Sequence, residues 1–444
     1  MLMTNHPLAQ NWRIATLLRF AAPTIFMMLF MGLYTLVDIL FVSRFVGSDA
    51  LSAINIVCPI TNLIVGLGTM LAAGGNAILS RKMGAGKHQE AKEDFTLLIL
   101  SGALIGVLLL VLGTLCMTPL LHLLGANPRL MPYAQDYLFF ILLFAPANML
   151  QTLFASLFIT AGKPNLGACL SVAAGITNII LDYLFIVICD LGIRGAALGT
   201  GMGMLLPSLG GIIVFSHKKG ILHFTKPVLR LSVLTESCFN GASELVSQCA
   251  AAVTTLLFNL TMMRLIGEDG VAAITIIIYS QFMLQTLFIG YSMGIAPIIG
   301  YNHGSENHPM QRRIMRTSLV LIGLASLLLF ALSRWHTTKL IACFATPDTT
   351  VFTLATQGFT LFTWSVLFCG TNIFTSAAFT ALSNGRLSAT LSFLRTFGLL
   401  APLILALPNI ANTTGLWLAI PLAESIMWVI SVGCLVCQQK RYGY

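Results

Sequence analysis

Residues 44–54 read RFVGSDALSAI and residues 264–274 read RLIGEDGVAAI, so one short motif occurs twice at a spacing of 220 residues. Two further pairs of segments match in the same order, and they lie at residues 121–128 with 340–347 and at residues 195–198 with 415–418. Ordered matches at a nearly fixed spacing indicate that a structural unit has been duplicated. We therefore expect two halves with the same fold.

The composition places the chain in a membrane. Of its 444 residues, 57% are apolar and only 9% are charged, and the mean hydropathy is +0.88. Soluble domains carry about 25% charged residues, so this chain is not a soluble protein. Its net charge of +9 is expected to lie in basic loops at the membrane surface, which argues against a nucleic-acid partner.

Twelve apolar segments are long enough to cross a bilayer, which takes roughly 20 residues per helix. They lie near residues 20–46, 51–79, 94–118, 133–160, 166–189, 195–216, 237–263, 271–300, 314–333, 351–381, 387–407 and 415–437. With six segments in each repeat, corresponding helices run in the same direction, and an axis along the membrane normal should relate the halves. The predicted fold class is an all-α integral membrane protein with twelve transmembrane helices in two pseudo-symmetric six-helix bundles.

The predicted organisation is two lobes joined by one polar segment. Residues 1–216 form the N-lobe with spans 1 to 6, residues 217–236 form a flexible cytoplasmic linker, and residues 237–444 form the C-lobe with spans 7 to 12. Most Lys and Arg residues fall on the side of the membrane that holds the linker and both termini. The positive-inside rule therefore predicts that both termini are cytoplasmic.

Five charged residues fall well inside the predicted spans, and they are Asp38, Asp182, Glu244, Arg395 and Glu424. A charge at the bilayer centre costs at least about 2.5 kcal/mol on insertion scales. Each of the five is therefore a candidate functional residue.

Asp38 and Asp182 are predicted to lie at the same depth. Each precedes the outer end of its span by eight residues, which places both roughly 12 Å below the outer surface. Thr200 reaches nearly that depth on the sixth span, and Asn178 lies one turn from Asp182 on the same helix face. The sequence thus groups two carboxylates, an amide and a hydroxyl within the N-lobe.

Two kinds of chemistry fit this group. Burial and mutual repulsion favour a proton on at least one carboxyl, which would make the pair a proton carrier. Alternatively, oxygens of Asp38, Asn178, Asp182 and Thr200 would bind Na⁺, because hard cations prefer oxygen ligands. A purely structural role is a third possibility, although two acids without a basic partner hold a bundle together poorly.

The remaining intramembrane charges belong to the C-lobe. Glu244 and Arg395 lie eight and nine residues from the inner ends of their spans, so we expect them to share a depth and to pair. Such a pair would act as a structural or gating bridge. Glu424, nine residues into the last span, is expected either to join this network or to face the cavity.

No motif indicates an enzyme. Residues 84–87 resemble the end of a phosphate-binding loop but lack its first glycine and its final Ser or Thr. Residues 199–203 are glycine-rich with the wrong spacing for a dinucleotide site, and they indicate close helix packing instead. No nucleophile, base and orienting group can be identified together. We expect no enzymatic activity, no cofactor and no metal other than Na⁺ at the acidic group.

Five segments taken together resemble the multidrug and toxic compound extrusion (MATE) transporters over nearly the whole chain. They are residues 34–38, 41–47, 83–86, 160–164 and 178–182. The sequence looks closest to the DNA-damage-inducible branch, whose members keep their cation site in the N-lobe. The resemblance implies that Asp38 and Asp182 bind the coupling H⁺ or Na⁺, with Asn178 and Thr200 as neighbouring ligands and Tyr34 one turn from Asp38.

The resemblance also implies a hinge. Pro23 matches the helix 1 proline of that branch, where bending is thought to accompany protonation, and a proline weakens any helix because it lacks an N–H. The sequence departs from the sodium-coupled branch, which uses an Asp on helix 10, since residues 351–381 contain no acid. A C-lobe sodium site of that kind is therefore not expected.

The expected function is secondary antiport. Organic, cationic and amphipathic compounds would leave in exchange for H⁺ or Na⁺ as the two lobes open alternately around a central cleft. We expect a monomer, surrounded by lipid in a bacterial plasma membrane. The nearest alternative is a flippase for lipid-linked precursors, which should show a more basic cavity than Arg395 alone provides. A membrane scaffold or an intramembrane enzyme is the alternative from another class.

Overall fold

The structure is a computed structural model that describes residues 7–218, 220–342 and 344–444. Most of these residues are helical, and no β-strand occurs among them. Lys219, which belongs to the predicted linker, lies outside the described residues, as do residues 1–6 of the predicted N-lobe.

The first half of the chain comprises η1 (Pro7–Ala9), α1 (Ile14–Phe41), η2 (Val42–Val46), α2 (Ser48–Gly84), α3 (His88–Leu115), α4 (Met117–Leu123), α5 (Met131–Leu143), α6 (Ala145–Thr160), α7 (Pro164–Asp182), η3 (Tyr183–Ile188) and α8 (Gly192–Ser216). The second half comprises α9 (Leu231–Asn240), α10 (Ala242–Leu265), α11 (Glu268–Gly304), α12 (His308–Trp335), α13 (Thr337–Ala342), α14 (Thr350–Phe362), η4 (Thr363–Ser365), α15 (Val366–Ala381), α16 (Gly385–Phe393), η5 (Leu394–Leu400), α17 (Ala401–Ala406) and α18 (Pro408–Tyr442).

The described helices supply the twelve predicted spans. Eleven spans are long and apolar enough to cross a membrane, and α5 with α6 forms one more that is bent by 51°. The bend falls where Pro146 enters the first turn of α6, because a proline has no N–H to continue the hydrogen bonds of α5. The predicted all-α fold class is confirmed.

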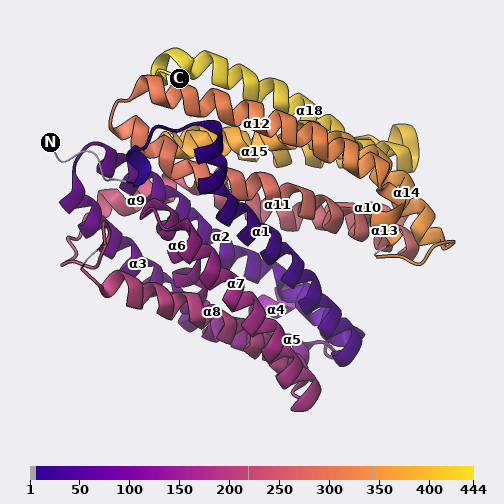
Figure 1. The fold of residues 1–444 in the computed structure, drawn as a ribbon. Helices are drawn as coiled ribbons and strands as arrows, with labels where there is room; N and C mark the ends of the chain where they lie inside the picture. Colours follow the sequence, from indigo (N-terminus) through magenta and orange to yellow (C-terminus); the bar gives the residue numbers. More distant parts are fainter. Residues whose placement is uncertain (1–6, 219, 343) are drawn as a thin grey trace.

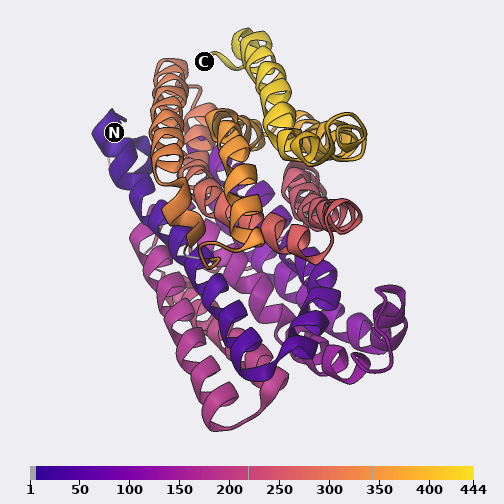
Figure 2. The same ribbon diagram turned by 90° about the vertical axis from the view of Figure 1, so that its right-hand side faces the viewer.

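The two halves lie side by side and meet most closely where the chain begins and ends. In Figures 1 and 2 most of the first half, coloured indigo to magenta, lies below α12, α15 and α18 of the second half, which are coloured orange to yellow. The first described element, η1, and the end of the last helix, α18, lie at the same end of the molecule, which we call the terminal end (Figure 1). The opposite end carries α4, α5, α13 and α14, and there the ribbons of the two halves diverge (Figure 1).

At the terminal end, α2 and α11 touch backbone to backbone. A Cβ added to Gly84 would lie 2.0 Å from the Tyr301 carbonyl oxygen, and one added to Gly304 would lie 2.0 Å from the Arg81 oxygen. Gly84 and Gly304 are 220 residues apart, and so are Arg81 and Tyr301. Repeat-related residues thus contact one another reciprocally, as expected on the axis that relates two similar halves.

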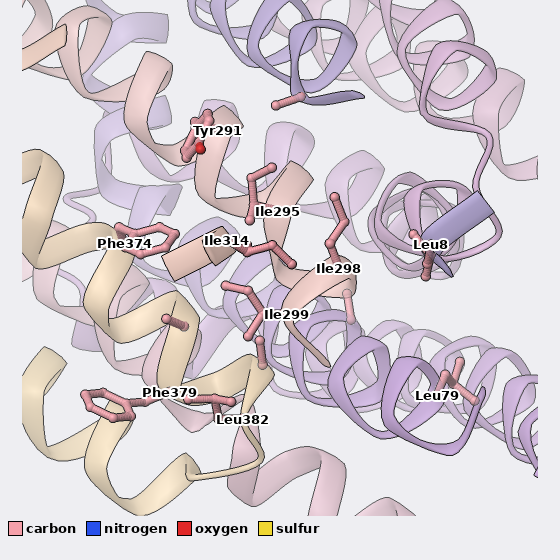
Figure 3. Close-up of a cluster of buried hydrophobic side chains, with 14 of the residues drawn as sticks. Leu8, Leu79, Tyr291, Ile295, Ile298, Ile299, Ile314, Phe374, Phe379 and Leu382 are labelled. Carbon is pink, nitrogen blue, oxygen red and sulfur yellow. The ribbon is translucent and has the colours of Figure 1, made fainter. Parts of the chain in front are cut away.

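Apolar and charged contacts reinforce this closure. Figure 3 shows Leu79 of α2 and Leu8 of η1 near the isoleucines of α11, among them Ile298, in the cluster of buried side chains that spans both halves. Arg81 of α2 also forms an ion pair with Glu236 of α9, with 2.8 Å between Nη2 and Oε1. The two halves are therefore sealed against each other at the terminal end.

The predicted flexible linker is shorter than expected and is fixed to the first half. Helix α9 already begins at Leu231, inside the segment 217–236. Just before it, Arg230 contacts Glu93 at 2.7 Å and Asp94 at 3.0 Å, and the fully buried Asp94 also binds Lys82 at 2.5 Å. Two cations compensate for burying this carboxylate. The length of the segment suggested flexibility, but its partners on α3 are far away in sequence and could not be seen there.

Candidate functional site

The predicted acid pair is formed. Asp38 near the end of α1 and Asp182 at the end of α7 approach closely enough for their side chains to hydrogen-bond to each other. Asp182 is almost completely buried, and its Oδ1 atom makes no hydrogen bond with another described residue. Two carboxylate anions this close would repel, so the contact is stable only with a proton or a cation to offset the charge.

Asn178 joins the acid pair to Thr200. In the amide orientation that satisfies both of its polar atoms, the nitrogen donates to the Oδ1 and Oδ2 atoms of Asp38 at 2.8 and 3.2 Å. The amide oxygen then accepts from the backbone N–H of Thr200 at 3.1 Å. Three helices, α1, α7 and α8, are thereby connected through one buried side chain.

Glycines let α8 approach α7 closely enough for this arrangement. A Cβ on Gly199 would lie 2.2 Å from Oδ1 of Asp182, and one on Gly203 would lie 3.2 Å from Cβ of Asn178. Glycines four residues apart form one face of a helix and allow close packing inside membranes. The glycine-rich segment 199–203 therefore packs directly against the acidic site.

Three of the five intramembrane charges lie in or beside a widened helical turn. The π-helical segments are η2, which begins four residues after Asp38, η3, which follows Asp182 directly, and η5, which contains Arg395. A π turn inserts an extra residue into a helix, and such insertions occur often at functional sites. The helices that carry these three charges are therefore irregular close to the charged residue.

A small pocket opens from the acidic group towards the terminal end. Its lining residues are Met31, Tyr34, Gln151, Ser171, Ala174, Gly175, Asn178, Thr200, Gly203 and Met204. The cavity volume is about 20 Å³, which is enough for a water molecule but too small for an organic compound. All five residues predicted for the cation site therefore lie together, with Tyr34, Asn178 and Thr200 on the pocket wall.

The predicted pair of Glu244 and Arg395 is not formed, because Arg395 binds Glu424 instead. The Nε and Nη2 atoms of Arg395 lie 2.8 and 2.5 Å from Oε1 of Glu424. The amide of Asn372 donates to the other carboxylate oxygen at 2.7 Å. Glu244 has no ion-pair partner among the described residues. Counting residues gives depth along a helix but not direction around it, so the sequence could not choose between the two acids.

Comparison with known proteins identifies the family. The family model MatE matches residues 23–184 and, a second time, residues 245–405, which together make up most of the chain. This chain belongs to the MATE family. The two matched segments begin 222 residues apart, in agreement with the repeat seen in the sequence.

Relatives of this MATE protein match it over almost their full length. It is 25% identical over 415 residues to the multidrug export protein MepA of Staphylococcus saprophyticus subsp. saprophyticus, covering 92% of this chain and 90% of MepA. The MepA protein of Staphylococcus haemolyticus is 24% identical over 416 residues, with the same coverage.

Solved structures share its fold. One is described as the outward-facing conformation of a multidrug resistance MATE family transporter, with a TM-score of 0.93, 18% identity and coverage of 100% and 99% of the two chains. A mutant of the Vibrio cholerae MATE transporter VcmN gives a TM-score of 0.88 at 22% identity, covering 96% of this chain and 97% of VcmN.

The acidic site of this MATE protein occurs in the first half only. The residues 220 positions after Asp38, Asn178, Asp182 and Thr200 are Phe258, Gly398, Pro402 and Ile420. None of these four can carry a charge or bind a cation through its side chain. The duplicated halves have therefore diverged, one towards an acid pair and the other towards the ion pair of Arg395 and Glu424.

Loss of one partner of this ion pair should destabilise the protein. Arg395→Met would leave the buried Glu424 carboxylate without its cation, which costs about 3–5 kcal/mol in comparable buried pairs. We expect a clearly lower unfolding temperature in detergent micelles. The double variant Arg395→Met with Glu424→Leu removes both charges and should recover most of the loss. An unchanged unfolding temperature for Arg395→Met would contradict the structural role of the pair.

Three residues near these sites gave no signal in the sequence of this MATE protein. Gln151 on α6 and Asn372 on α15 are neutral residues in apolar spans, and Tyr137 on α5 lies near both acids. Intramembrane charges stand out because they are rare, whereas amides and tyrosines occur in many membrane helices without a role. Only the folded structure selects these three.

Proposed function

We propose that this MATE protein is a secondary antiporter that exports organic, cationic and amphipathic compounds in exchange for protons. The observation that carries the proposal is the contact between Asp38 and Asp182 inside the first half of a twelve-span family member. The name of the relatives, multidrug export protein, supports organic cargo, and the acidic groups favour cargo that is cationic. Acidic groups in a membrane interior attract both protons and cationic cargo. The two ligands therefore compete for the same negative charge.

The hydrogen bonds that the oxygen atoms of the site already make favour protons over Na⁺ as the coupling ion. The close approach of the Asp38 and Asp182 carboxyls supports a proton shared between them. Asn178 turns its nitrogen towards Asp38, and its oxygen accepts from Thr200. A sodium ion needs several oxygen ligands, and in this orientation the amide offers it none.

Coupling is proposed to act through α1, which carries both Asp38 and Pro23. Pro23 has no N–H to donate to the carbonyl of Arg19, so α1 lacks one hydrogen bond in the turn between these two residues and bends most easily there. Proton binding would neutralise the acid pair, bend α1 at this hinge and drive cargo out of the cleft. Proton binding moves cargo only if the protein's affinity for the proton differs between the two arrangements of the halves.

The terminal end is proposed to face the cytoplasm of a bacterial cell. The excess of Lys and Arg at that end supports this orientation. Since the halves are sealed there by α2 and α11, the structure would represent the state that is closed to the cytoplasm. We further propose that the transporter works as a monomer, surrounded by lipid in the plasma membrane.

Reconstitution into liposomes tests the proposed function. Liposomes loaded with a fluorescent amphipathic cation are given either a pH gradient or a Na⁺ gradient, and dye movement is followed. We expect the pH gradient alone to drive transport by the wild-type protein. Transport driven only by Na⁺ would reject proton coupling, and no transport under either gradient would reject antiport of organic cations.

A further inference from the structure

We infer that the pocket beside Asn178 holds a water molecule that relays protons between the acid pair and the terminal end, and that Gln151 positions this water. The inference rests on the proposed proton coupling and extends it by a binding site. The pocket lies between α1, α6, α7 and α8, on the side of the acid pair that faces the terminal end.

The size and chemistry of the pocket suit water. Its volume of about 20 Å³ exceeds the 10–15 Å³ that one water needs and leaves little room for more. Its polar side chains are Tyr34, Gln151, Ser171, Asn178 and Thr200, and none of the described lining residues is charged. Neutral hydroxyl and amide groups hydrogen-bond water readily, whereas a bound metal cation would lack a charge to compensate it.

Gln151 supplies a second, independent observation. Its Oε1 atom is buried and accepts no hydrogen bond from any described residue. Leaving a buried acceptor without a partner is unfavourable, and in a membrane span no lipid atom can donate to it. A water in the adjoining pocket would satisfy this oxygen.

The position of the pocket suits a relay. Ser171 on the pocket wall lies seven residues before Asn178 on α7, so the pocket extends from the acidic site towards the terminal end. Asn178 and Thr200 belong both to the pocket wall and to the acidic site. The water would accept a proton from this site and release another towards the terminal end. It is regenerated in the process, so no further reactant is needed.

X-ray footprinting of the protein in detergent micelles tests for the water directly. Hydroxyl radicals formed from a bound water oxidise neighbouring side chains, and Met31 and Met204 line the pocket. We expect both to be oxidised several-fold faster in the wild type than in Gln151→Leu, which removes the acceptor. Gln151→Glu keeps an oxygen at this position and should restore the oxidation. Met149 on the same helix as Gln151 is fully buried and serves as a control that stays unoxidised in all three proteins.

Transport by the same variants tests the relay. Gln151→Leu should slow pH-gradient-driven efflux at least tenfold and introduce a solvent isotope effect, since proton delivery becomes rate-limiting. Gln151→Glu should restore much of the rate. Thr371→Val, at the repeat-related position of the second half, should transport like the wild type.

The outcomes separate the two proposals. If Met31 and Met204 are oxidised no faster than Met149, or equally in wild type and Gln151→Leu, the pocket holds no such water. If Gln151→Leu retains wild-type proton-driven efflux, the relay is refuted while antiport stands. If the wild type itself shows no proton-driven efflux, the proposed function fails, whatever the footprinting shows.

Discussion

Asp38→Asn is expected to reduce pH-gradient-driven efflux to the level of protein-free liposomes. The substitution keeps the size and hydrogen-bonding reach of the side chain but removes the group that takes up and releases a proton. The contact with Asp182 and the amide of Asn178 depend on the same two oxygens. Because an amide cannot titrate, binding a proton can no longer distinguish the two arrangements of the halves, and coupling is lost.

Asp182→Asn should have the same effect, because in the proposed mechanism the two acids share one proton. Asp136→Asn provides a matched control in the same half, since Asp136 pairs with Arg194 on the surface and lies outside the site. Efflux, protein yield and unfolding temperature are measured for all three variants. Undiminished gradient-driven efflux by Asp38→Asn would contradict the assignment of the cation site.

The acid pair could be found from the sequence because membrane helices have a known direction and a known rise per residue. Asp38 and Asp182 were placed at one depth by counting from the ends of their spans, and the structure brings them into contact. Asn178 could be added because it lies one helical turn away. Depth and local helix geometry were therefore sufficient for this site.

The same counting failed in the second half, where the helices depart from regular geometry. Arg395 lies in the π-helical segment η5, and Glu244 follows the break between α9 and α10 at Gly241. Each irregularity turns the following side chains around the helix axis. Depth alone therefore suggested Glu244 as the partner, whereas the folded chain directs Arg395 to Glu424. The sequence also could not predict that Arg230 binds α3, because its partners there lie 136 and 137 residues away in the chain.

The duplication explains how one fold serves two tasks. Corresponding helices of the two halves still meet in symmetric contacts, such as those of Gly84 and Gly304. The charged sites, in contrast, are not symmetric, since Phe258 stands at the position related to Asp38. In the proposed mechanism, proton binding in the first half changes the contact between the halves without an equal event in the second half. A symmetric seal combined with an asymmetric charge site is suited to driving a rocking motion with one cation site.

Gly84→Ala is expected to abolish transport by keeping the terminal end open. The added Cβ would lie 2.0 Å from the Tyr301 oxygen, which is more than 1 Å closer than real carbon and oxygen atoms approach. Both groups belong to helix backbones and cannot move aside as a flexible side chain would. The helices α2 and α11 must therefore separate at this point.

Electron paramagnetic resonance can measure this separation. Spin labels at the exposed positions Gln89 and Arg312 report the distance between the halves at the terminal end, on a background without reactive cysteines. We expect a longer mean distance in Gly84→Ala than in the protein with both glycines intact, together with loss of efflux. Gly323→Ala and Gly433→Ala are controls, because an added Cβ meets no atom within 4 Å at either position.

The pseudo-symmetry of the two halves predicts the same effect for Gly304, the residue related to Gly84 by the repeat. A Cβ on Gly304 would lie 2.0 Å from the Arg81 oxygen, so Gly304→Ala introduces the same clash from the other half. Both variants should open the terminal end by the same amount and lose transport equally, even though only the first half carries the acid pair. Combining them should add little, because either Cβ already prevents the contact. Normal efflux in either single variant, or opening in only one of them, would show that the seal does not depend on this reciprocal contact.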